Sequence, residues 1–414
     1  MKPNCLIAQS GGPTAVINNS VCGVVQEALK QQMFDHVYGA LFGIKGFLDE
    51  KIIDVGKESE TLIENFRYTP GAVLGTSRHK ITKTEEYLKI LEIFKKYDIR
   101  YFFYIGGNDS MDTSSKIHQM AVSEGYDLKV IGVPKTVDND LPFTDHTPGY
   151  GSAAKYIATT VQETAIDLFG AISSTRVYIL EAMGRNAGWL TASSALGKIT
   201  EEDAPHLIYL PEPAFDVGGF LKDVEDCYKR YGDVYVVISE GLKGADGQYV
   251  YREEVTDSFG HAKLGGGLAN YLKEIVEKEL GYSTRSTTLG TSQRSAIHYA
   301  SKVDADEAYQ VGVEAVRLAA DGASGVMVTL DRSDEGGYHV KMGQIELQQV
   351  ANQEKKVPAS MINARGNGVT EEFIRYARPL IQGNLALPMK DGLPDFARMN
   401  VMKDRNNVKF GKMK

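Results

Sequence analysis

The chain is long enough, and apolar enough, to fold around two hydrophobic cores. It has 414 residues, of which 43% are hydrophobic and 24% are charged, and this profile excludes disordered, collagen-like and coiled-coil proteins. Its 46 Lys and Arg residues are outnumbered by 54 Asp and Glu residues, which gives a formal charge of −8 and argues against a nucleic-acid partner. We therefore expect a folded, acidic protein of enzyme size.

Cysteine usage and hydropathy indicate a reducing compartment and no membrane. Cys5, Cys22 and Cys227 show no CxxC or Cys/His spacing, so we interpret them as small buried side chains rather than as a disulfide framework or a zinc site. A strand-like run begins at Cys5, and no later stretch approaches the roughly 18 apolar residues of a membrane span. We expect a cytoplasmic protein without a membrane partner.

Taken in chain order, the predicted elements alternate between strands and helices. Short β-branched or aromatic runs predict strands at 4–8, 101–105, 129–133, 176–181, 234–239, 287–290 and 325–330. Helical patterns are predicted to end near residues 30 and 123, to cover about 186–196, and to start again near 370–372. Such alternation is typical of parallel sheets, which bind ligands at the carboxyl ends of their strands. Polar turns follow most of the predicted strands, so we expect them to lie together.

Two glycine pairs follow predicted strands. Gly11-Gly12 and Gly106-Gly107 each stand between a strand and a helix, where backbone N–H groups and the positive end of a helix can hold an anion. Two such turns suggest a polyphosphate, although glycines also simply close strand-to-helix turns. The usual P-loop pattern is absent, and the loose GxGxxA pattern at 149–154 is a weak dinucleotide signal because Pro148 interrupts its entry.

Asp138 and Asp140 flank Asn139 directly after an apolar strand. In an extended segment this spacing sends both carboxylates to one side, so one can take a proton while the other holds a metal ion. Phosphoryl transfer needs such a carboxylate, a divalent cation and positive side chains, and Lys135 and Thr136 stand beside it. The alternative is an Asp/Asn turn that satisfies its own backbone.

Arginines cluster at predicted strand ends and turns of this acidic chain. Their planar guanidinium groups suit phosphate oxygens, although each alone is more often a surface residue. Met183 is ordinarily a core residue, but beside Gly184 and Arg185 it can form the apolar wall of a sugar pocket. The arginines in question are Arg78, Arg176, Arg185, Arg285 and Arg294.

Five motifs in this order resemble those of the phosphofructokinases, and they span residues 4 to about 330. They are Gly-Gly at 11–12, Gly-Gly-x-x-Ser at 106–110, Pro-x-Thr-Val-Asp-Asn-Asp at 134–140, Met-Gly-Arg at 183–185 and Leu-Gly-x-x-Gln-Arg at 289–294. The resemblance implies an α/β fold of two interleaved Rossmann-like three-layer domains with mostly parallel sheets. We expect a phosphoryl-donor domain at 1–149 plus about 290–360, a sugar-phosphate domain at 150–289 plus about 361–386, and a peripheral tail at 387–414.

The resemblance implies transfer of a phosphoryl group to the 1-hydroxyl of fructose 6-phosphate. By position, Asp138 resembles the catalytic base, Thr136 a neighbour that orients the reacting groups, and Arg185 the cation that stabilises the transferring group. Positions that match sugar-holding or 6-phosphate-binding residues are Met183, Gly184, Glu240, Arg176, Arg285 and Arg294, besides Thr136, Asp138 and Arg185. Positions on the donor side are Gly11, Gly12, Arg78, Gly107, Asp109, Ser110 and Lys135, of which Lys135 is also counted as catalytic.

Two positions resemble the pyrophosphate-dependent branch of the family. Where ATP-using members have glycines, this chain has Asp109 and Lys135. A carboxylate at 109 obstructs the inner phosphates of a nucleotide, and an ammonium group at 135 suits compact pyrophosphate. Mg²⁺ is the implied cofactor, with Asn108 and Asp140 as its expected ligands. Asn108 replaces a common aspartate and an amide is the weaker ligand, so the alternative is that Asp109, Asp140 or water holds the ion.

The resemblance also leaves alternatives. Some family members take 6-phosphate-binding arginines from a neighbouring subunit, which implies a homodimer or homotetramer with shared active sites. Thr291 stands where the family commonly has histidine or an aromatic residue. The alternative functions are an ATP-dependent phosphofructokinase that tolerates Asp109 and Lys135, and a silent regulatory subunit that binds sugar phosphate. A seven-carbon ketose phosphate is an alternative acceptor.

Overall fold

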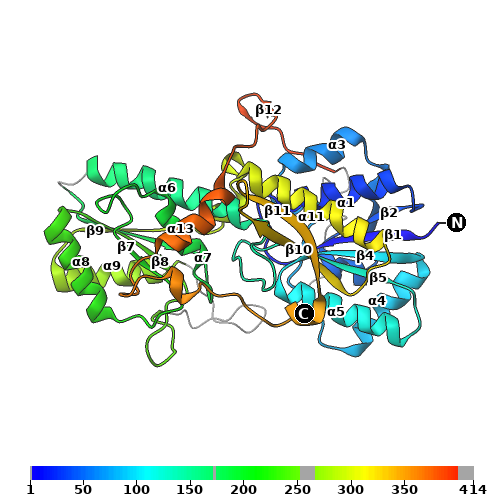
Figure 1. Cartoon of the computed structure of the whole chain (residues 1–414), viewed down its shortest axis with the longest axis horizontal. Helices are drawn as coiled ribbons and strands as arrows, with labels where there is room; N and C mark the ends of the chain where they lie inside the picture. The colour runs from blue at the N-terminus through cyan, green and yellow to red at the C-terminus, as the bar shows by residue number, and fades with distance from the viewer. Residues whose placement is uncertain (1, 171–173, 252–265, 400–414) are drawn as a thin grey trace.

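The structure is a computed structural model that describes residues 2–170, 174–251 and 266–399. Two lobes lie side by side, and each is built around its own sheet (Figure 1). Helices cover both faces of each sheet, so each lobe has three layers. The predicted α/β class with two mostly parallel sheets is confirmed.

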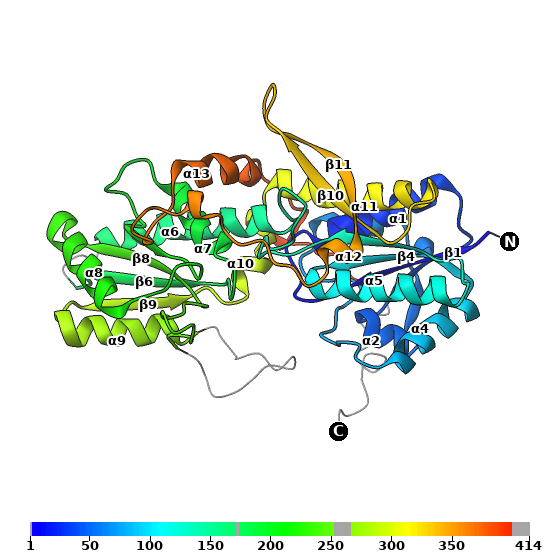
Figure 2. The same cartoon turned by 60° about the horizontal axis from the view of Figure 1, so that its bottom comes forward.

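The larger sheet has seven strands in the order β11-β10-β5-β4-β1-β2-β3. Its inner strands, from β10 to β2, are parallel, while β11 and β3 run antiparallel to their neighbours at the two edges. The bounds are β1 Asn4–Gln9, β2 Val37–Ala40, β3 Ile52–Asp54, β4 Ile99–Gly106, β5 Lys129–Pro134, β10 Val326–Ser333 and β11 His339–Glu346. The β10–β11 hairpin projects beyond the sheet (Figure 2).

The smaller sheet has four strands in the order β7-β8-β6-β9, and all of their pairings are parallel. The bounds are β6 Val177–Ala182, β7 Leu207–Tyr209, β8 Val234–Ser239 and β9 Thr284–Thr288. Because these strands are parallel, their carboxyl ends share one edge and their amino ends share the opposite edge. A separate two-stranded pair joins β12 (Met389–Lys390) to β13 (Leu393–Pro394).

The helices divide between the two sheets. Those on the larger sheet are α1 Ile17–Gln31, α2 Gly43–Leu48, α3 Glu60–Asn65, α4 Thr84–Lys96, α5 Asn108–Ser123, α11 Lys302–Ala320 and α12 Leu347–Val350. Those on the smaller sheet are α6 Tyr150–Gly170, α7 Trp189–Ser193, α8 Val217–Tyr231, α9 Leu268–Leu280 and α13 Glu371–Ala377. The short helix α10 covers Ser292–Ser295, after β9. None of the described helices is long and apolar enough to cross a membrane.

Two glycines allow α1 and α11 to touch through their backbones. A Cβ on Gly23 would collide with the carbonyl of Tyr309, and a Cβ on Gly312 would collide with the carbonyl of Ser20. Any side chain at either position would push the helices apart. The contact brings residues 302–320 back onto the lobe in which the chain begins.

Within the described residues, the chain passes between the lobes four times. The core of the larger-sheet lobe includes residues up to 133, then 311–350, and finally Met399, whereas the core of the smaller-sheet lobe includes 150–289, 357 and 373–380. Between 133 and 150, Val137 packs in the smaller-sheet core and Leu141 in the larger-sheet core, so this segment contacts both and is counted as one passage. The passages therefore lie within 133–150, 289–311, 350–357 and 380–399. In the last of them, the backbone N–H of Ala397 donates to Oγ1 of Thr69 at 2.9 Å.

Most of the predicted elements are confirmed. The predicted strands other than 287–290 correspond to β1, β4, β5, β6, β8 and β10, with ends within three residues. The strand predicted at 287–290 is shifted, because β9 starts at Thr284 and the chain turns at Gly290, where φ is +54°. The helix predicted at 186–196 starts later, at Trp189, and continues as a 3₁₀ turn from Ser194.

The cysteines and the start of the tail can also be placed. Cys5 and Cys22 are buried as expected, Cys227 is half-buried, and all three are free. The predicted peripheral tail includes Met399, whose side chain is buried in the core of the larger-sheet lobe, whereas Met389 and Leu393 are exposed. Residues 400–414 of the predicted tail lie outside the described residues.

Candidate active site

The turn after β5 carries two carboxylates. Asp138 and Asp140 flank Asn139, whose φ of +54° lies in the left-handed region. The expectation of an extended segment is therefore wrong, because an extended strand needs negative φ at every residue, and asparagine tolerates the left-handed region well. The carboxylates nevertheless lie close together, since the charge of Asp138 contributes to raising the pKa of Asp140.

The Asp138 carboxylate lies in a cluster of opposite charges. Burial raises its pKa to about 6, and the nearby Glu240 carboxylate acts in the same direction. The cations that oppose this shift are Lys135, Arg294 and Arg185. These side chains come from loops after β5, β6, β8 and β9, so the carboxyl ends of the two sheets meet at this point. A carboxylate with this pKa is mostly ionised at pH 7 and can accept a proton.

Thr136 stabilises the turn through two hydrogen bonds. Its Oγ1 accepts the backbone N–H of Asp138 at 3.1 Å, and its carbonyl accepts the hydroxyl of Thr147 at 2.8 Å. The side chain is buried. Thr136 therefore fixes the backbone that carries the Asp138 carboxylate.

Lys135 is a buried cation next to this turn. It is 4% exposed, and its Nζ donates to the carbonyl of Gly12 at 2.9 Å. Burial lowers the pKa of Lys135 to about 8, although Asp138 and Asp140 favour its charged form. At pH 7 the ammonium group is still mostly charged, so a positive group that can attract an anion lies next to the two carboxylates.

The two glycine turns differ from each other. Gly107 directly precedes α5, as expected of an anion-binding helix N-terminus. Gly12 also lies between a strand and a helix, but farther from the helix, because residues 13–16 form an irregular loop and α1 begins only at Ile17. Glycine serves a different purpose here: a Cβ on Gly12 would collide with the guanidinium of Arg294, and one on Gly11, where φ is +73°, would lie 3.4 Å from Nζ of Lys135.

The other residues predicted to bind the phosphoryl donor lie around Lys135 and Gly12. Arg78 is exposed, and its charge lowers the pKa of both Lys135 and Arg294, so the three cations are neighbours. Asp109 is exposed in the first turn of α5, whereas Ser110 is buried. Positive groups thus gather opposite the start of α5.

The smaller-sheet lobe contributes the loop after β6. The backbone N–H of Met183 donates to Oε1 of Gln293 at 3.1 Å, and the carbonyl of Gly184 accepts the hydroxyl of Ser239. Gly184 has a φ of +133°, and a Cβ there would collide with the carbonyl of Ala187, so this position requires glycine. The loop after β6 is thereby tied to the ends of β8 and β9.

Arg185 and Glu240 stand together at this edge. A Cβ on Gly241 would collide with the backbone of Arg185, which shows how closely the two loops approach. Burial raises the pKa of Glu240, the buried carboxylate of Glu181 adds to the shift, and Arg185 opposes it. Two carboxylates therefore face the site from opposite lobes, Asp138 and Glu240.

Asn108 and Asp140 meet across the gap between α5 and the β5 turn. Nδ2 of Asn108 lies 3.5 Å from Oδ2 of Asp140, and Oδ1 of Asn108 is buried without a hydrogen-bond partner. Burial raises the pKa of Asp140 to about 7, and the Asp138 and Glu354 carboxylates add to this shift. An unpaired amide oxygen beside a crowded carboxylate suits a hard divalent cation.

Two predicted residues are not brought to this site. Arg176 directly precedes β6 and Arg285 is the second residue of β9, so both lie at the amino edge of the smaller sheet. Met183 stands at the opposite edge, and the seven residue steps from Arg176 span roughly 20 Å at about 3.3 Å per residue. Within one chain, these arginines cannot join Asp138.

The comparisons identify the fold family. The phosphofructokinase family model matches residues 4–319, which is more than half of the chain. The chain belongs to the phosphofructokinase family.

Similar proteins cover almost the whole length of this phosphofructokinase. A pyrophosphate–fructose 6-phosphate 1-phosphotransferase from Halomonas elongata is 43% identical over 402 residues, which is 96% of each chain. The crystal structure of a pyrophosphate-dependent phosphofructokinase from Marinobacter aquaeolei has a TM-score of 0.89 and 42% identity, and covers 97% of this chain and 96% of its own. A sulfofructose kinase from Alkalicoccus urumqiensis is 36% identical, over 87% of this chain and 92% of its own.

Some residues of this phosphofructokinase site were missed from the sequence. Gln293 lies inside a motif that was used for Arg294, so the signal was available. Lys355 left no such signal: its backbone N–H donates to the carbonyl of Asp140 at 2.7 Å, and its Nζ donates to the carbonyl of Asp145 at 2.7 Å. Burial lowers the pKa of Lys355 to about 8.

A buried ion cluster lies next to the turn after β5, which carries Asp138 and Asp140. The ring of His146 bonds Oδ2 of Asp145 at 2.8 Å and Oε2 of Glu307 at 2.6 Å, and it is 1% exposed. Burial lowers the pKa of His146, but the two carboxylates outweigh it and raise the value to about 9. The cluster ties the loop after the turn to α11.

The loose GxGxxA pattern has a structural purpose. Both carboxylate oxygens of Asp304 accept backbone N–H groups at the start of α6, from Gly149 at 2.8 Å and Ser152 at 2.9 Å. The side chain therefore occupies the place that a dinucleotide phosphate would need. The weak dinucleotide signal is explained by this cap.

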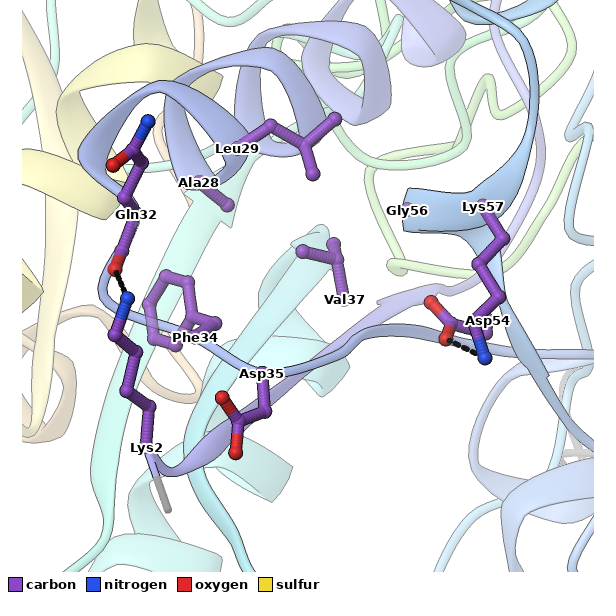
Figure 3. Close-up of a pocket in the computed structure, with 10 residues that line it drawn as sticks. All are labelled: Lys2, Ala28, Leu29, Gln32, Phe34, Asp35, Val37, Asp54, Gly56 and Lys57. Carbon is purple, nitrogen blue, oxygen red and sulfur yellow. Dashed lines mark hydrogen bonds and ion pairs between the residues drawn. The ribbon is translucent and has the colours of Figure 1, made fainter.

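A cavity of about 280 Å³ lies away from the charged cluster (Figure 3). Its floor is apolar, and its rim carries ionic groups, including the Asp54–Lys57 pair at 3.2 Å. It opens at the amino ends of β1 and β2, the edge opposite the catalytic turn. The residues that line it are Lys2, Ala28, Leu29, Gln32, Phe34, Asp35, Val37, Asp54, Gly56 and Lys57.

Proposed function

We propose that this protein transfers a phosphoryl group from pyrophosphate to the 1-hydroxyl of fructose 6-phosphate, giving fructose 1,6-bisphosphate and phosphate. The observation that carries the proposal is the buried Asp138 carboxylate, set among the cations Lys135, Arg185 and Arg294 where the two sheets meet. The near full-length similarity to pyrophosphate-dependent enzymes supports the same donor and acceptor. The reaction is reversible, because the phosphoanhydride of pyrophosphate has little surplus driving force over the sugar phosphate.

Asp138 is the general base of the transfer. It accepts the proton of the sugar 1-hydroxyl as the hydroxyl oxygen bonds to phosphorus, and the inorganic phosphate leaves with the electrons of the broken P–O bond. Arg185 stabilises the charge on the transferring phosphoryl group, and Thr136 keeps the base in place through its bond to the backbone N–H of Asp138. Most of the catalytic effect in such a reaction comes from positioning and charge stabilisation.

The sugar binds between the lobes. Met183, Gly184 and Glu240 hold the sugar ring, with Glu240 accepting hydrogen bonds from its hydroxyl groups. Gln293 fixes the loop of Met183 from behind through the 3.1 Å bond. Arg294, from the same chain as Asp138, binds the 6-phosphate. Its guanidinium lies over Gly12, so it is also close to the donor.

Pyrophosphate binds where the positive groups gather. Lys135 and Arg78 neutralise the donor, and the backbone N–H groups after Gly107 receive it at the start of α5. Gly11, Gly12 and Ser110 line the same corner. The carboxylate of Asp109 stands where a nucleotide would extend, so it selects against ATP by volume and charge.

Mg²⁺ is the proposed cofactor, with Asn108 and Asp140 as its protein ligands. Their oxygens fit this ion, because Oδ1 of Asn108 is buried without a partner and Asp140 lies beside it. The described residues contain no group of three or more His, Cys, Asp and Glu side chains that could hold a metal ion. This agrees with Mg²⁺, which usually keeps several waters and binds one or two carboxylates together with substrate phosphates. When bound, Mg²⁺ would neutralise charge on the donor.

The active sites are proposed to be shared in a homodimer or homotetramer. Arg176 and Arg285 lie side by side at the amino edge of the smaller sheet, where the N–H of Arg176 donates to the carbonyl of Ser283 at 2.8 Å. Next to them, α6 ends in two exposed apolar residues, Ile166 and Phe169, 74% and 71% exposed. A second copy that covers this surface would receive both arginines at the 6-phosphate of its own sugar.

The test is the rate of fructose 1,6-bisphosphate formation from fructose 6-phosphate and Mg²⁺, with pyrophosphate or ATP at matched concentration. We expect turnover with pyrophosphate alone. Turnover with ATP alone would overturn the donor assignment, and silence with both would favour the regulatory subunit. Sulfofructose and a seven-carbon ketose phosphate, offered as competing acceptors, should give a lower kcat/KM than fructose 6-phosphate.

The selectivity for pyrophosphate over ATP has a separate test. Replacing Asp109 and Lys135 together by glycine restores the pattern of ATP-using family members, so we expect the ratio of kcat/KM for pyrophosphate to that for ATP to fall at least about tenfold. The matched control is Lys129→Gly, a lysine near the start of β5 that is paired with Asp127 at 3.2 Å. An unchanged ratio in the double variant would show that these residues do not select the donor.

A further inference from the structure

The C-terminal part of the chain reaches the catalytic turn from outside the matched family region. The family model ends at residue 319, whereas α13 covers Glu371–Ala377 and lies against the smaller-sheet lobe (Figures 1 and 2). Phe373 and Ala377 are buried in the core of that lobe and anchor the helix. Tyr376 comes from the same helix and contacts the turn after β5.

Asn139 is the residue through which this contact acts. Its left-handed φ of +54° sets the relative direction of the residues before and after it, Asp138 and Asp140. Both polar atoms of its side chain are bonded: Oδ1 accepts the backbone N–H of Thr147 at 3.0 Å, and Nδ2 donates to the hydroxyl of Tyr376 at 2.8 Å. A left-handed residue other than glycine is strained and persists when its surroundings hold it.

The hydroxyl of Tyr376 bridges two parts of the loop. It accepts from Asn139 and donates to the carbonyl of Asp145 at 2.7 Å. Burial raises the pKa of Tyr376 well above its usual value, so the hydroxyl keeps the proton that it donates.

The ring and backbone of Tyr376 are fixed independently of the hydroxyl. The Trp189 ring lies 5.2 Å away, the guanidinium of Arg332 lies over the Tyr376 ring at 5.6 Å, and NH1 of Arg332 donates to the Tyr376 carbonyl at 2.8 Å. Removing the hydroxyl alone therefore leaves the packing in place. What it removes is the hydrogen bond from Asn139 and the one to the Asp145 carbonyl, which keeps the Nζ of Lys355 as a donor.

We infer that Tyr376 is a positioning residue for the phosphoryl transfer, which holds Asn139 in its left-handed conformation and thereby aims the carboxylates of Asp138 and Asp140. This rests on the proposed function, in which Asp138 is the base. The hydroxyl of Tyr376 bonds Asn139 and Asp145, neither of which is proposed to bind substrate, so its loss should impair the chemical step and leave substrate binding intact.

The first test is Tyr376→Phe. Because small displacements of reacting groups reduce rates strongly, we expect kcat to fall about tenfold, while the KM values for fructose 6-phosphate and pyrophosphate change by less than about twofold. Fluorescence of Trp189, the single tryptophan of the chain, and the thermal midpoint report whether the packing is intact. A lower thermal midpoint with unchanged kcat would mean that the tyrosine is only structural, and would overturn the inference.

A double-mutant cycle tests whether the effect passes through Asn139. Glycine adopts a left-handed φ without strain, so Asn139→Gly no longer needs the tyrosine. In that background, Tyr376→Phe should lower kcat by less than about twofold. An equal tenfold loss in both backgrounds would contradict the inference. If Tyr376→Phe does not fold, the inference is tested by comparing Asn139→Gly with Asn139→Ala. The kcat of the glycine variant should be several-fold higher than that of the alanine variant, and equal kcat values would overturn the inference.

Tyr338→Phe is the matched control. The Tyr338 ring also lies under Arg332, at 5.0 Å, but its hydroxyl donates to Glu307 rather than accepting from Asn139. Its kcat should equal that of the unmodified enzyme, and a tenfold loss there would show that any disturbance of this aromatic cluster impairs catalysis. Turnover by the unmodified enzyme is measured in the same assay: its absence would contradict the proposed function, whereas its presence with an unaffected Tyr376→Phe would contradict only the inference.

Discussion

The two edges of the smaller sheet carry residues proposed to bind the sugar phosphate, and their surroundings are opposite. At the carboxyl edge, Arg185 and Glu240 are partly buried and act on the charge of Asp138 from the other lobe. At the amino edge, the Arg285 side chain is 52% exposed, and its ion pair with Asp167 is long, at 3.8 Å. The difference teaches that one chain brings together the groups proposed for the chemical step, whereas Arg176 and Arg285, two of the arginines proposed to bind the 6-phosphate, lie at the other edge.

The pKa values at the carboxyl edge show how strongly its charges act on one another. At the carboxyl edge, burial raises the pKa of Asp138 to about 6 and lowers that of Lys135 to about 8. Each shift favours the neutral form, but both groups remain mostly charged at pH 7 because they face each other. A charge cluster of this kind is typical of a functional site. The following predictions test each edge, from the largest expected effect to the smallest.

Asp138→Asn should have the largest effect. The amide cannot accept the proton of the 1-hydroxyl, so we expect kcat with pyrophosphate to fall about 10³-fold, within the range known for general bases. The thermal midpoint should change little, since the variant removes a buried charge that burial disfavours. The control is Asp127→Asn, an exposed aspartate paired with Lys129, which should retain full activity. A loss of less than tenfold at Asp138 would remove it from the role of base.

His146→Gln tests how much the buried ion pairs of His146 with Asp145 and Glu307 stabilise the fold. The folded pKa of about 9 lies above the usual 6.5, so the charged ring stabilises the fold fully below pH 6.5, and this stability is lost as pH rises through 9. The shift corresponds to about 3 kcal/mol, the loss of unfolding free energy that we expect for the variant near pH 6.

Urea unfolding at pH 6 and pH 9.5 measures this difference. The difference in the free energy of unfolding between the unmodified protein and His146→Gln should be smaller at pH 9.5 than at pH 6. His79→Gln is the control, because the pair of His79 with Glu86 is partly exposed and should contribute less than about 1 kcal/mol. A gap that is the same at both pH values would show that the charge of His146 does not stabilise the fold.

Arg285→Ala tests the amino edge. Loss of a charged contact to the 6-phosphate should raise the KM for fructose 6-phosphate about 30-fold, which is about 2 kcal/mol, with a small change in kcat. Arg230→Ala, which removes an exposed pair with Glu201, should leave the KM unchanged.

Co-expression sharpens this result. An Arg285→Ala subunit keeps its base, and an Asp138→Asn subunit keeps its arginine, so a mixed oligomer contains restored sites. In a randomly mixed dimer, about a quarter of the sites would recover. No recovery in a verified mixed oligomer would contradict shared sites.

Asn108→Asp should have the smallest effect. A second carboxylate beside Asp140 is a better ligand for a hard cation than an amide, so we expect the Mg²⁺ concentration for half-maximal activity to fall about threefold. Without Mg²⁺, the two like charges repel, so the thermal midpoint of the metal-free variant should also fall. A higher Mg²⁺ requirement would show that Asn108 is not a ligand.

The sequence was sufficient for the parts of the fold with a strong local pattern. Strands such as β1, β5 and β8 are uninterrupted apolar runs followed by polar turns, and the structure confirms them. By contrast, β11 alternates exposed and half-buried residues at a sheet edge, and β2 and β7 are only four and three residues long, so each left little signal. The boundaries of the two expected domains stay a prediction.

The site was predictable where a motif carried it and unpredictable where packing did. Asp138, Lys135 and Arg185 stand in local motifs, and the structure places them in one cluster. The left-handed Asn139 and the hydroxyl of Tyr376 are 237 positions apart, and no local pattern links them. The role of Arg285 stays a prediction: it lies at the amino end of β9, as it would before the strand predicted at 287–290, and the sequence does not show what reaches that edge.

The four chain passages between the lobes have a mechanical consequence. A domain pair joined by one linker can swing widely, but four separate connections behave as a broad hinge that permits only a small rotation or a slide. Closure over the sugar should therefore be a movement of limited amplitude. Cutting one connection by limited proteolysis should leave the lobes associated through the other three.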